Sequence, residues 1–145
     1  MFIKQISIFL ENVPGALREM THLLGEGGVD LLALSIADTA NFGIVRVIVA
    51  DHQIDPALAL LRGAGYTAKV NNVLCVAVED RPGGLCDLLE VVETSGSSVE
   101  YLYSFLRRLE GDGVVALRAN LPGAAVKVLM ENGISPLRED QLKKK

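Results

Sequence analysis

A proline–glycine pair stands twice in the chain, each time between an apolar run and a stretch with helical spacing. The two segments are "NVPGAL" at residues 12–17 and "DRPGGL" at residues 80–85. Proline fixes φ near the helical value, and glycine lets another molecule approach the backbone because it has no Cβ. The first N–H groups of a helix lack partners within it and favour a negative charge. Each turn can therefore hold a carboxylate, although a proline at a helix start often only begins the helix.

Residues for other kinds of chemistry are missing. We find no nucleophile with a base beside it, no metal-ligand cluster and no long phosphate-binding loop, so we expect no enzyme, no catalytic residue, no metal and no cofactor.

Cys75 and Cys86 have no third cysteine near them, and we expect two free, buried thiols. The net charge of −4 argues against nucleic acid. The apolar start is interrupted at Lys4, which argues against a membrane span or a signal and predicts a cytoplasmic protein.

The chain consists of two copies of one unit. Pro82 lies 68 residues after Pro14, and the same offset superposes Leu61 on Leu129 near the far end of the unit. One offset at both ends is the signature of an internal repeat. We predict a first domain at residues 1–71, a second at 72–138 and a charged tail at 139–145.

Each copy follows the order βαββαβ. The first strand alternates apolar and polar residues from Gln5 to Glu11, and a helix is predicted from Pro14, at its first position, to the glycines near residue 28. Two strands follow, and then a second helix capped by Asp55 and a closing strand. The second copy repeats this order and closes with a strand at residues 134–138. Two split βαβ units give an α+β fold, ferredoxin-like in each copy, with four antiparallel strands and both helices on one face.

Two long phrases carry a family resemblance. They are "FLENVPGALREMTHLLGEGGVDLLALSIAD" and "VEDRPGGLCDLLEVVETSGSSVEYLYSF", each with a strand, a (D/E/N)-x-P-G-x-L turn, a helix ending in glycine and a further strand. This pattern resembles the ACT domain, and the resemblance covers essentially residues 1–138. It implies that a free amino acid binds at the seam between paired copies. A chain made only of such domains resembles a free-standing sensor, or a regulatory subunit of an amino-acid-metabolism enzyme.

The resemblance also implies the ligand-binding residues: the side chain two places before the turn proline, the backbone that follows, and a polar side chain at the start of the second strand of a neighbouring copy. In the first copy these positions are Asn12, Val13, Pro14, Gly15, Ala16, Leu17 and Asp30. In the second copy they are Asp80, Arg81, Pro82, Gly83, Gly84, Leu85 and Ser98. Asn12 suits the role because an amide can accept from an ammonium and donate to a carboxylate. Asp80 would repel a carboxylate, which makes the second turn the weaker candidate. Asp30 could pair with an ammonium or lie at an exposed edge.

The second strands of the two copies differ on one face. Ser35 stands there between two alanines, whereas the second copy has Tyr101, Tyr103 and Phe105 at the matching places. The rings could fill a hollow where two sheets meet, or the tyrosine hydroxyls could line a pocket, with Ser35 and Asp38 as further pocket or interface residues. A face so apolar, beside unpaired strand edges, is expected to be covered by the other copy or by a second chain. We therefore expect a homodimer.

Three functions remain open at this point. The first is a non-enzymatic regulator that binds a free amino acid between copies, without nucleic acid or membrane. The second is an assembly module whose sheet faces bind protein and whose turns bind nothing. The third is an enzyme on the same scaffold, such as an acyl-phosphate hydrolase, for which the catalytic residues are missing.

Overall fold

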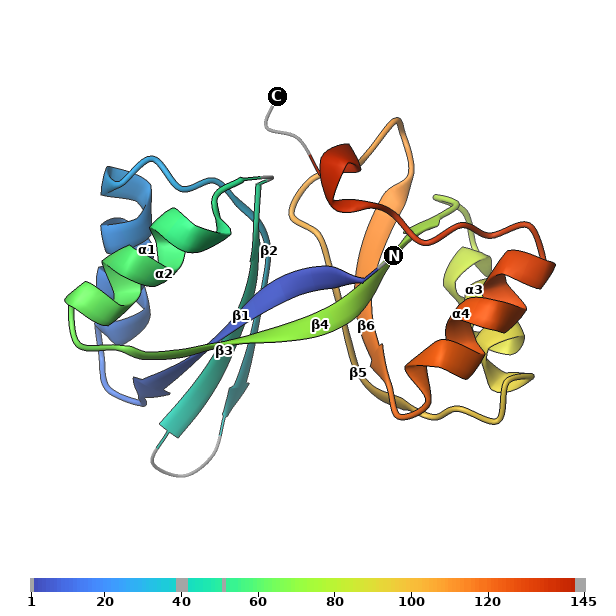
Figure 1. The fold of residues 1–145 in the computed structure, drawn as a ribbon, viewed down its shortest axis with the longest axis horizontal. Helices are drawn as coiled ribbons and strands as arrows, with labels where there is room; N and C mark the ends of the chain where they lie inside the picture. The colour runs from blue at the N-terminus through green and yellow to red at the C-terminus, as the bar shows by residue number, and fades with distance from the viewer. Residues whose placement is uncertain (1, 39–41, 51, 143–145) are drawn as a thin grey trace. The chain divides into compact units, whose positions relative to one another are not determined.

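The computed structural model describes residues 2–38, 42–50 and 52–142 of the 145. The chain divides into two compact units, one mainly of Lys4–Asn71 and one mainly of Asn72–Gln141. We call them the N-terminal unit and the C-terminal unit. Each has the predicted α+β composition, and Figure 1 shows its two helices together on one side of its strands.

The N-terminal unit contains six elements, and its strands follow the order β2-β3-β1-β4. Strand β3 pairs antiparallel with β1 and with β2, and Val45 lies opposite Ile8 on one side and Ile36 on the other. The Ser7 hydroxyl donates to Asn71 Oδ1 at 2.7 Å. The bounds are β1 (Ile3–Glu11), α1 (Ala16–Glu26), β2 (Leu31–Asp38), β3 (Phe42–Val49), α2 (Ile54–Gly63) and β4 (Thr67–Val78).

The core of this unit forms where one face of the strands meets the two helices. Alternate residues of β1, which point to one face, pack against buried residues of α1 and α2. The fully buried members include Ile6, Ile8, Met20, Leu24, Val45 and Leu61.

The C-terminal unit repeats this plan. Its strands follow the order β4-β6-β5, so β4 serves both as the closing strand of the first copy and as the opening strand of the second. A second core contains Leu74, Val76, Val92, Leu117 and Leu129. The bounds are α3 (Gly84–Glu93), β5 (Val99–Ser104), β6 (Gly113–Ala119), α4 (Pro122–Glu131) and a 3-10 turn at Glu139–Gln141.

The ferredoxin-like α+β arrangement is confirmed, with one difference in the second copy. Residues 134–138 were predicted to form its closing strand, but they have no regular strand structure. Pro136 has no N–H to donate to a neighbouring strand. The Leu137 N–H still donates to the Cys75 carbonyl oxygen at 2.7 Å, so the segment runs beside β4 without a continuous ladder.

Three predicted helix starts are wrong by two residues, and one of them is that of α3, which was predicted from Pro82 and begins at Gly84. Helix α1 begins at Ala16, so Pro14 lies in the turn before it, and Gly15 occupies the N-cap with φ 85°. Helix α2 begins at Ile54, and its N-cap is Gln53 rather than Asp55. The left-handed φ of Gly15 explains the error at α1, because glycine adopts that conformation readily and ends the extended run before the helix can begin.

The two thiols have different environments. Cys75 is buried, and its burial raises the pKa of the thiol from 9.0 to about 12. Cys86 is exposed, so the prediction that both thiols are buried is wrong for Cys86. It lies near the start of α3 on the side that faces solvent.

The described residues contain neither a membrane-spanning helix nor a metal-binding cluster. None of the helices is long and apolar enough to cross a membrane. Nowhere in the described ranges do three or more His, Cys, Asp or Glu side chains gather in a way that could hold a metal ion.

Candidate functional site

The first proline–glycine turn joins the end of β1 to the start of α1. The Ala16 N–H donates to the Val13 carbonyl at 3.2 Å, and the Glu19 N–H donates to the Gly15 carbonyl at 2.9 Å. A Cβ placed on Gly15 would meet no atom within 4 Å, so the space beside this glycine is open. The amides of Ala16 and Glu19 are already bonded within the turn, which leaves the N–H groups of Leu17 and Arg18 for an anion.

A cavity of about 480 Å³ lies against this turn. Of the residues predicted from the sequence, Val13, Pro14 and Ala16 line it. The other walls come from the ends of β1, β3 and β4 and from the first turn of α1, and they were missed: Phe9, Glu11, Glu19, Phe42 and Tyr66. Three of the seven Phe and Tyr residues of the chain thus meet two carboxylates at one cavity.

The second turn has the same backbone. Gly83 has φ 83° and precedes α3, the Gly84 N–H donates to the Arg81 carbonyl at 3.0 Å, and the Asp87 N–H donates to the Gly83 carbonyl at 2.9 Å. A Cβ on Gly84 would stand 2.2 Å from the Glu79 carbonyl oxygen. This turn is therefore packed more tightly against the strand than the first, where Ala16 occupies the matching position.

The side chain of Arg81 lies over the second turn. Its Nε donates to Glu79 Oε2 at 2.7 Å, its Nη1 donates to the Pro82 carbonyl at 3.2 Å, and its Nη2 donates to Asp87 Oδ2. The hydrogen bonds to Glu79 and Asp87 raise the pKa of the guanidinium above its ordinary value. Nη1 is also the atom nearest to where a Cβ of Gly83 would be, at 3.7 Å. The space that is open beside Gly15 is therefore occupied beside Gly83.

Asp80, whose contact with a ligand stays a prediction, forms an ion pair within its own unit. Arg108 Nη1, from the connection between β5 and β6, lies 2.7 Å from Asp80 Oδ2. Both residues line a cavity of about 340 Å³ together with Leu85 and Phe105. The structure thus brings three predicted residues of the second copy together, but it supplies Asp80 with a cation from the same unit.

Asp30 lies at the opposite end of α1 from the first turn. An 11-residue helix separates the two, and such a helix is about 16 Å long. The Asp30 N–H donates to Gln53 Oε1 at 2.7 Å, and Gln53 Nε2 donates to the Gly28 carbonyl at 2.9 Å. Asp30 and the turn of its own copy are therefore not brought together, so a site that uses both needs residues from another copy.

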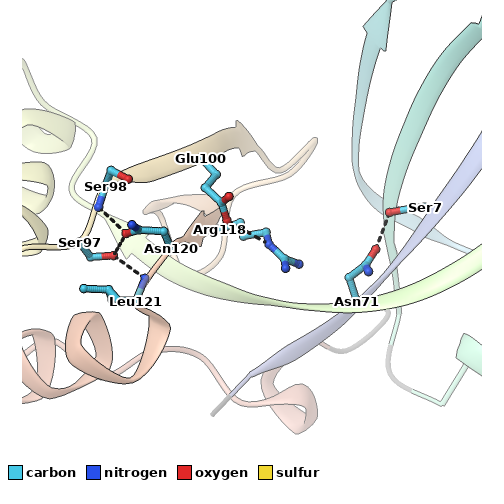
Figure 2. A network of polar contacts seen from close by, with 8 residues as sticks. All are labelled: Ser7, Asn71, Ser97, Ser98, Glu100, Arg118, Asn120 and Leu121. Carbon is cyan, nitrogen blue, oxygen red and sulfur yellow. Dashed lines mark hydrogen bonds and ion pairs between the residues drawn. The ribbon is translucent and has the colours of Figure 1, made fainter.

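Ser98 has the corresponding position in the second copy, where Figure 2 shows a polar network. Its N–H donates to Asn120 Oδ1 at 2.8 Å, and the Ser97 hydroxyl donates to the same oxygen at 3.0 Å. The Leu121 N–H in turn donates to Ser97 Oγ at 3.0 Å. In both copies an amide side chain, Gln53 or Asn120, holds the start of the second strand. Contact of Asp30 or Ser98 with a ligand stays a prediction.

Three aromatic residues, Tyr101, Tyr103 and Phe105, lie in β5 or directly after it. The rings of Tyr101 and Tyr103 stack with their centroids 6.4 Å apart and their planes 24° apart. Tyr103 is buried, whereas Tyr101 and Phe105 are half-buried. On the neighbouring strand β6, Arg118 lies opposite Tyr101, and its Nε donates to Glu100 Oε1 at 3.3 Å (Figure 2).

In the first copy, the residues of β2 that match these aromatic residues have small side chains, and Ser35 is the polar one among them. Ser35 is half-buried and lies opposite Arg46 in the pairing of β2 with β3. Asp38 ends β2 opposite Gly43. Because Glu11 lies opposite Phe42 at the start of β3, Asp38 is at the same end of the sheet as the first turn.

A larger cavity, of about 690 Å³, lies between α3 and the edge strand β5. Its walls are mostly apolar and include Leu85, Cys86, Val99 and Leu102. This groove contains few groups that could orient a small polar ligand, so its size does not make it the better ligand site.

The chain was compared with known proteins. A family model described as "ACT domain pair" matches residues 1–145. The solved structure of protein BT0572 from Bacteroides thetaiotaomicron is 34% identical, with a TM-score of 0.88 over 100% of this chain and 98% of that chain. The regulatory subunits of aspartate kinase from Thermus thermophilus and Thermus flavus are 17% and 13% identical, with TM-scores of 0.63 and 0.58 over 88% of this chain and 90% of theirs. A search of curated proteins returned no match.

Proposed function

Because the chain belongs to the ACT domain pair family, we propose that it is a regulatory protein that binds a free amino acid at its first proline–glycine turn. The observation that carries this proposal is the open space beside Gly15 at the start of α1, next to a cavity of about 480 Å³. The N–H groups in the first turn of α1 hold the ligand's carboxylate, and the Asn12 side chain contacts its polar groups.

The regulatory subunits of aspartate kinase share this fold, and that likeness of fold supports the proposed regulatory role. The ligand completes its contacts with residues of another copy, because Asp30 lies at the far end of α1 from the turn of its own copy. We propose a cytoplasmic homodimer in which ligand binding favours one arrangement of the copies and so alters a partner enzyme of amino-acid metabolism.

A thermal-shift screen with the proteinogenic amino acids at millimolar concentration tests the proposal. A ligand present at 100 times its Kd adds about 2.7 kcal/mol to the free energy of unfolding. For a chain of this size that raises Tm by roughly 5 to 10 °C. If no amino acid moves the melting curve, the amino-acid-binding function is wrong.

A matched pair of variants locates the site. Asn12→Ala removes the amide that contacts the ligand, so its melting curve should respond less than that of the wild type. Asp80→Ala changes the equivalent position of the second copy and should respond as the wild type does. Gly15 is unsuitable for this test, because any other residue at φ 85° is strained even without a ligand. Equal responses of the two variants would place the site elsewhere.

A second candidate function is assembly with another protein, and the groove between α3 and β5 favours it. Its walls are mostly apolar, and Leu85 and Val99 are exposed large hydrophobic residues beside an edge strand. In this case the turns bind no ligand, and the screen above gives no shift. Leu85→Lys should then weaken assembly in sedimentation experiments, whereas Leu121→Lys, at another exposed leucine, should not.

A further inference from the structure

The two turns carry the same pair of acidic positions, and the residue just before the proline is one of four between them that differ. Glu79 stands three residues before Pro82, and Asp87 stands five residues after it. Glu11 and Glu19 occupy the same two positions around the first proline. Between them, the second copy has Arg81 and the first copy has Val13.

The second copy shows what these two carboxylates can hold. The Arg81 guanidinium donates to Glu79, to Asp87 and to the Pro82 carbonyl, so two carboxylates and one backbone oxygen surround one planar cation. A guanidinium carries its N–H donors in a fixed fork that fits carboxylates in this way. The turn therefore forms a guanidinium site that its own chain fills.

The first copy has the same acceptors without the arginine. Glu11 and Glu19 line the same cavity, as does Pro14. Among the described residues, neither carboxylate forms an ion pair or a side-chain hydrogen bond. The Val13 side chain, about half exposed, ends in methyl groups and cannot neutralise them.

The walls of the first cavity suit a planar cation. Phe9 and Tyr66 line it where the second copy has Ala77 and Ile134 at the same offset. Phe42 lines it as well. The Lys69 ammonium already lies 5.9 Å from the centre of the Phe9 ring, so this ring attracts positive charge. The chain itself positions the guanidinium of Arg81 at the second turn, whereas a free ligand at the first turn must be positioned by the side chains around the cavity.

We propose that the cavity at the first turn takes the guanidinium group of a small ligand, held between Glu11 and Glu19 in the place that the Arg81 side chain fills at the second turn. The inference rests on the proposed amino-acid-binding function and names the class of ligand, an amino acid or close relative with a guanidinium side chain. Each chain then binds one ligand, because the second turn holds its own arginine.

Isothermal titration with L-arginine and L-citrulline tests the charge. Citrulline has nearly the same shape but carries a neutral urea group in place of the guanidinium. We expect one arginine bound per chain and at least roughly tenfold weaker binding of citrulline, since hydrogen bonds to charged groups are the stronger kind. Equal affinity for the two would overturn the inference and leave amino-acid binding in place.

Variants at the two turns test the place. Val13→Arg should supply the missing guanidinium from the chain and abolish arginine binding, whereas Val13→Leu should bind as the wild type does. Glu11→Gln and Glu19→Gln should each weaken arginine binding roughly tenfold. Glu79→Gln, at the equivalent place of the second copy, should have no effect. Wild-type affinity in Val13→Arg or in both glutamine variants would refute the assignment.

Butylguanidine, which has no carboxylate or α-ammonium, separates this inference from the function on which it rests. If no amino acid binds but butylguanidine binds and loses affinity in Glu11→Gln, the guanidinium site stands and the amino-acid function fails. If neutral amino acids bind but neither arginine nor butylguanidine does, the function stands and the guanidinium site fails. Unliganded melting curves identify any variant that does not fold.

Discussion

The tight packing of the second turn predicts a large difference between two Gly→Ala substitutions. In Gly84→Ala the new Cβ would stand 2.2 Å from the Glu79 carbonyl oxygen, more than an ångström inside the shortest ordinary contact of 3.4 Å. Because the opposing atom belongs to the backbone, the start of α3 must move away from β4. Forcing extra atoms into a packed site costs about 1–3 kcal/mol.

Gly123→Ala is the matched control. Gly123 lies in the first turn of α4, and a Cβ there would meet no atom within 4 Å. Its φ is not in the left-handed region, so alanine fits and should stabilise the helix by about 0.4–1 kcal/mol through the unfolded state. The two variants should therefore differ by about 1.5–4 kcal/mol in the free energy of unfolding, measured by urea denaturation with circular dichroism.

The first copy supplies the outcome that would refute this reasoning. Ala16 occupies there the position that Gly84 has in the second copy, so the turn can be built with a Cβ. If Gly84→Ala is as stable as the wild type, the second turn relaxes to the geometry of the first at no cost. The close approach of Gly84 to Glu79 would then not constrain the turn.

Further predictions concern the polar network and the thiols. Asn120→Ala removes the acceptor of the Ser98 N–H and the Ser97 hydroxyl and should lower the free energy of unfolding by about 1–3 kcal/mol, whereas Asn132→Ala, whose side chain bonds only at an exposed helix end, should change it by less than about 1 kcal/mol. In native protein a thiol reagent at pH 8 should modify Cys86 and not Cys75, and in denaturant it should modify both. Burial raises the pKa of Cys75, so its folded state holds the proton more tightly. This contribution to the free energy of unfolding is full below pH 9 and is lost as the pH rises toward about 12. The free energy of unfolding should therefore fall less steeply with pH in Cys75→Ala than in the wild type.

The fold was predictable because it depends on patterns that many residues share. The alternating apolar residues of β1 lie in the first core. Leu61 and Leu129, which the repeat offset matches, lie in the first and the second core. A misplaced helix start, as at Pro14, changes none of these contacts. The closing strand at 134–138 failed for a local reason, since one proline is enough to remove a donor from a ladder.

The candidate site was predictable only in part, because it depends on single side chains. The pattern located both turns, and in the structure Gly15 and Gly83 have the same left-handed conformation. It did not reveal that the Arg81 side chain folds back over its own turn, or that Phe42 and Tyr66, far apart in the sequence, meet beside Pro14. A comparison of the copies at the repeat offset could have drawn attention to Val13 and Arg81, because both copies have acidic residues at the same positions before and after them.

Under the proposal, the duplication gives two turns with the same backbone different roles: the first binds a ligand, and the second supports the fold. A turn that ends a strand, places glycine in the left-handed region and begins a helix exposes the same donors and the same flanking carboxylates in either copy. Where residue 81 is an arginine, its guanidinium pairs with the carboxylates of its own chain and lies over the turn. Where residue 13 is a valine, two carboxylates border an aromatic cavity, and under the proposal a cation that enters forms ion pairs with them. Under the proposal, a single side chain at this position decides which turn responds to the surroundings of the protein and which one only supports the fold.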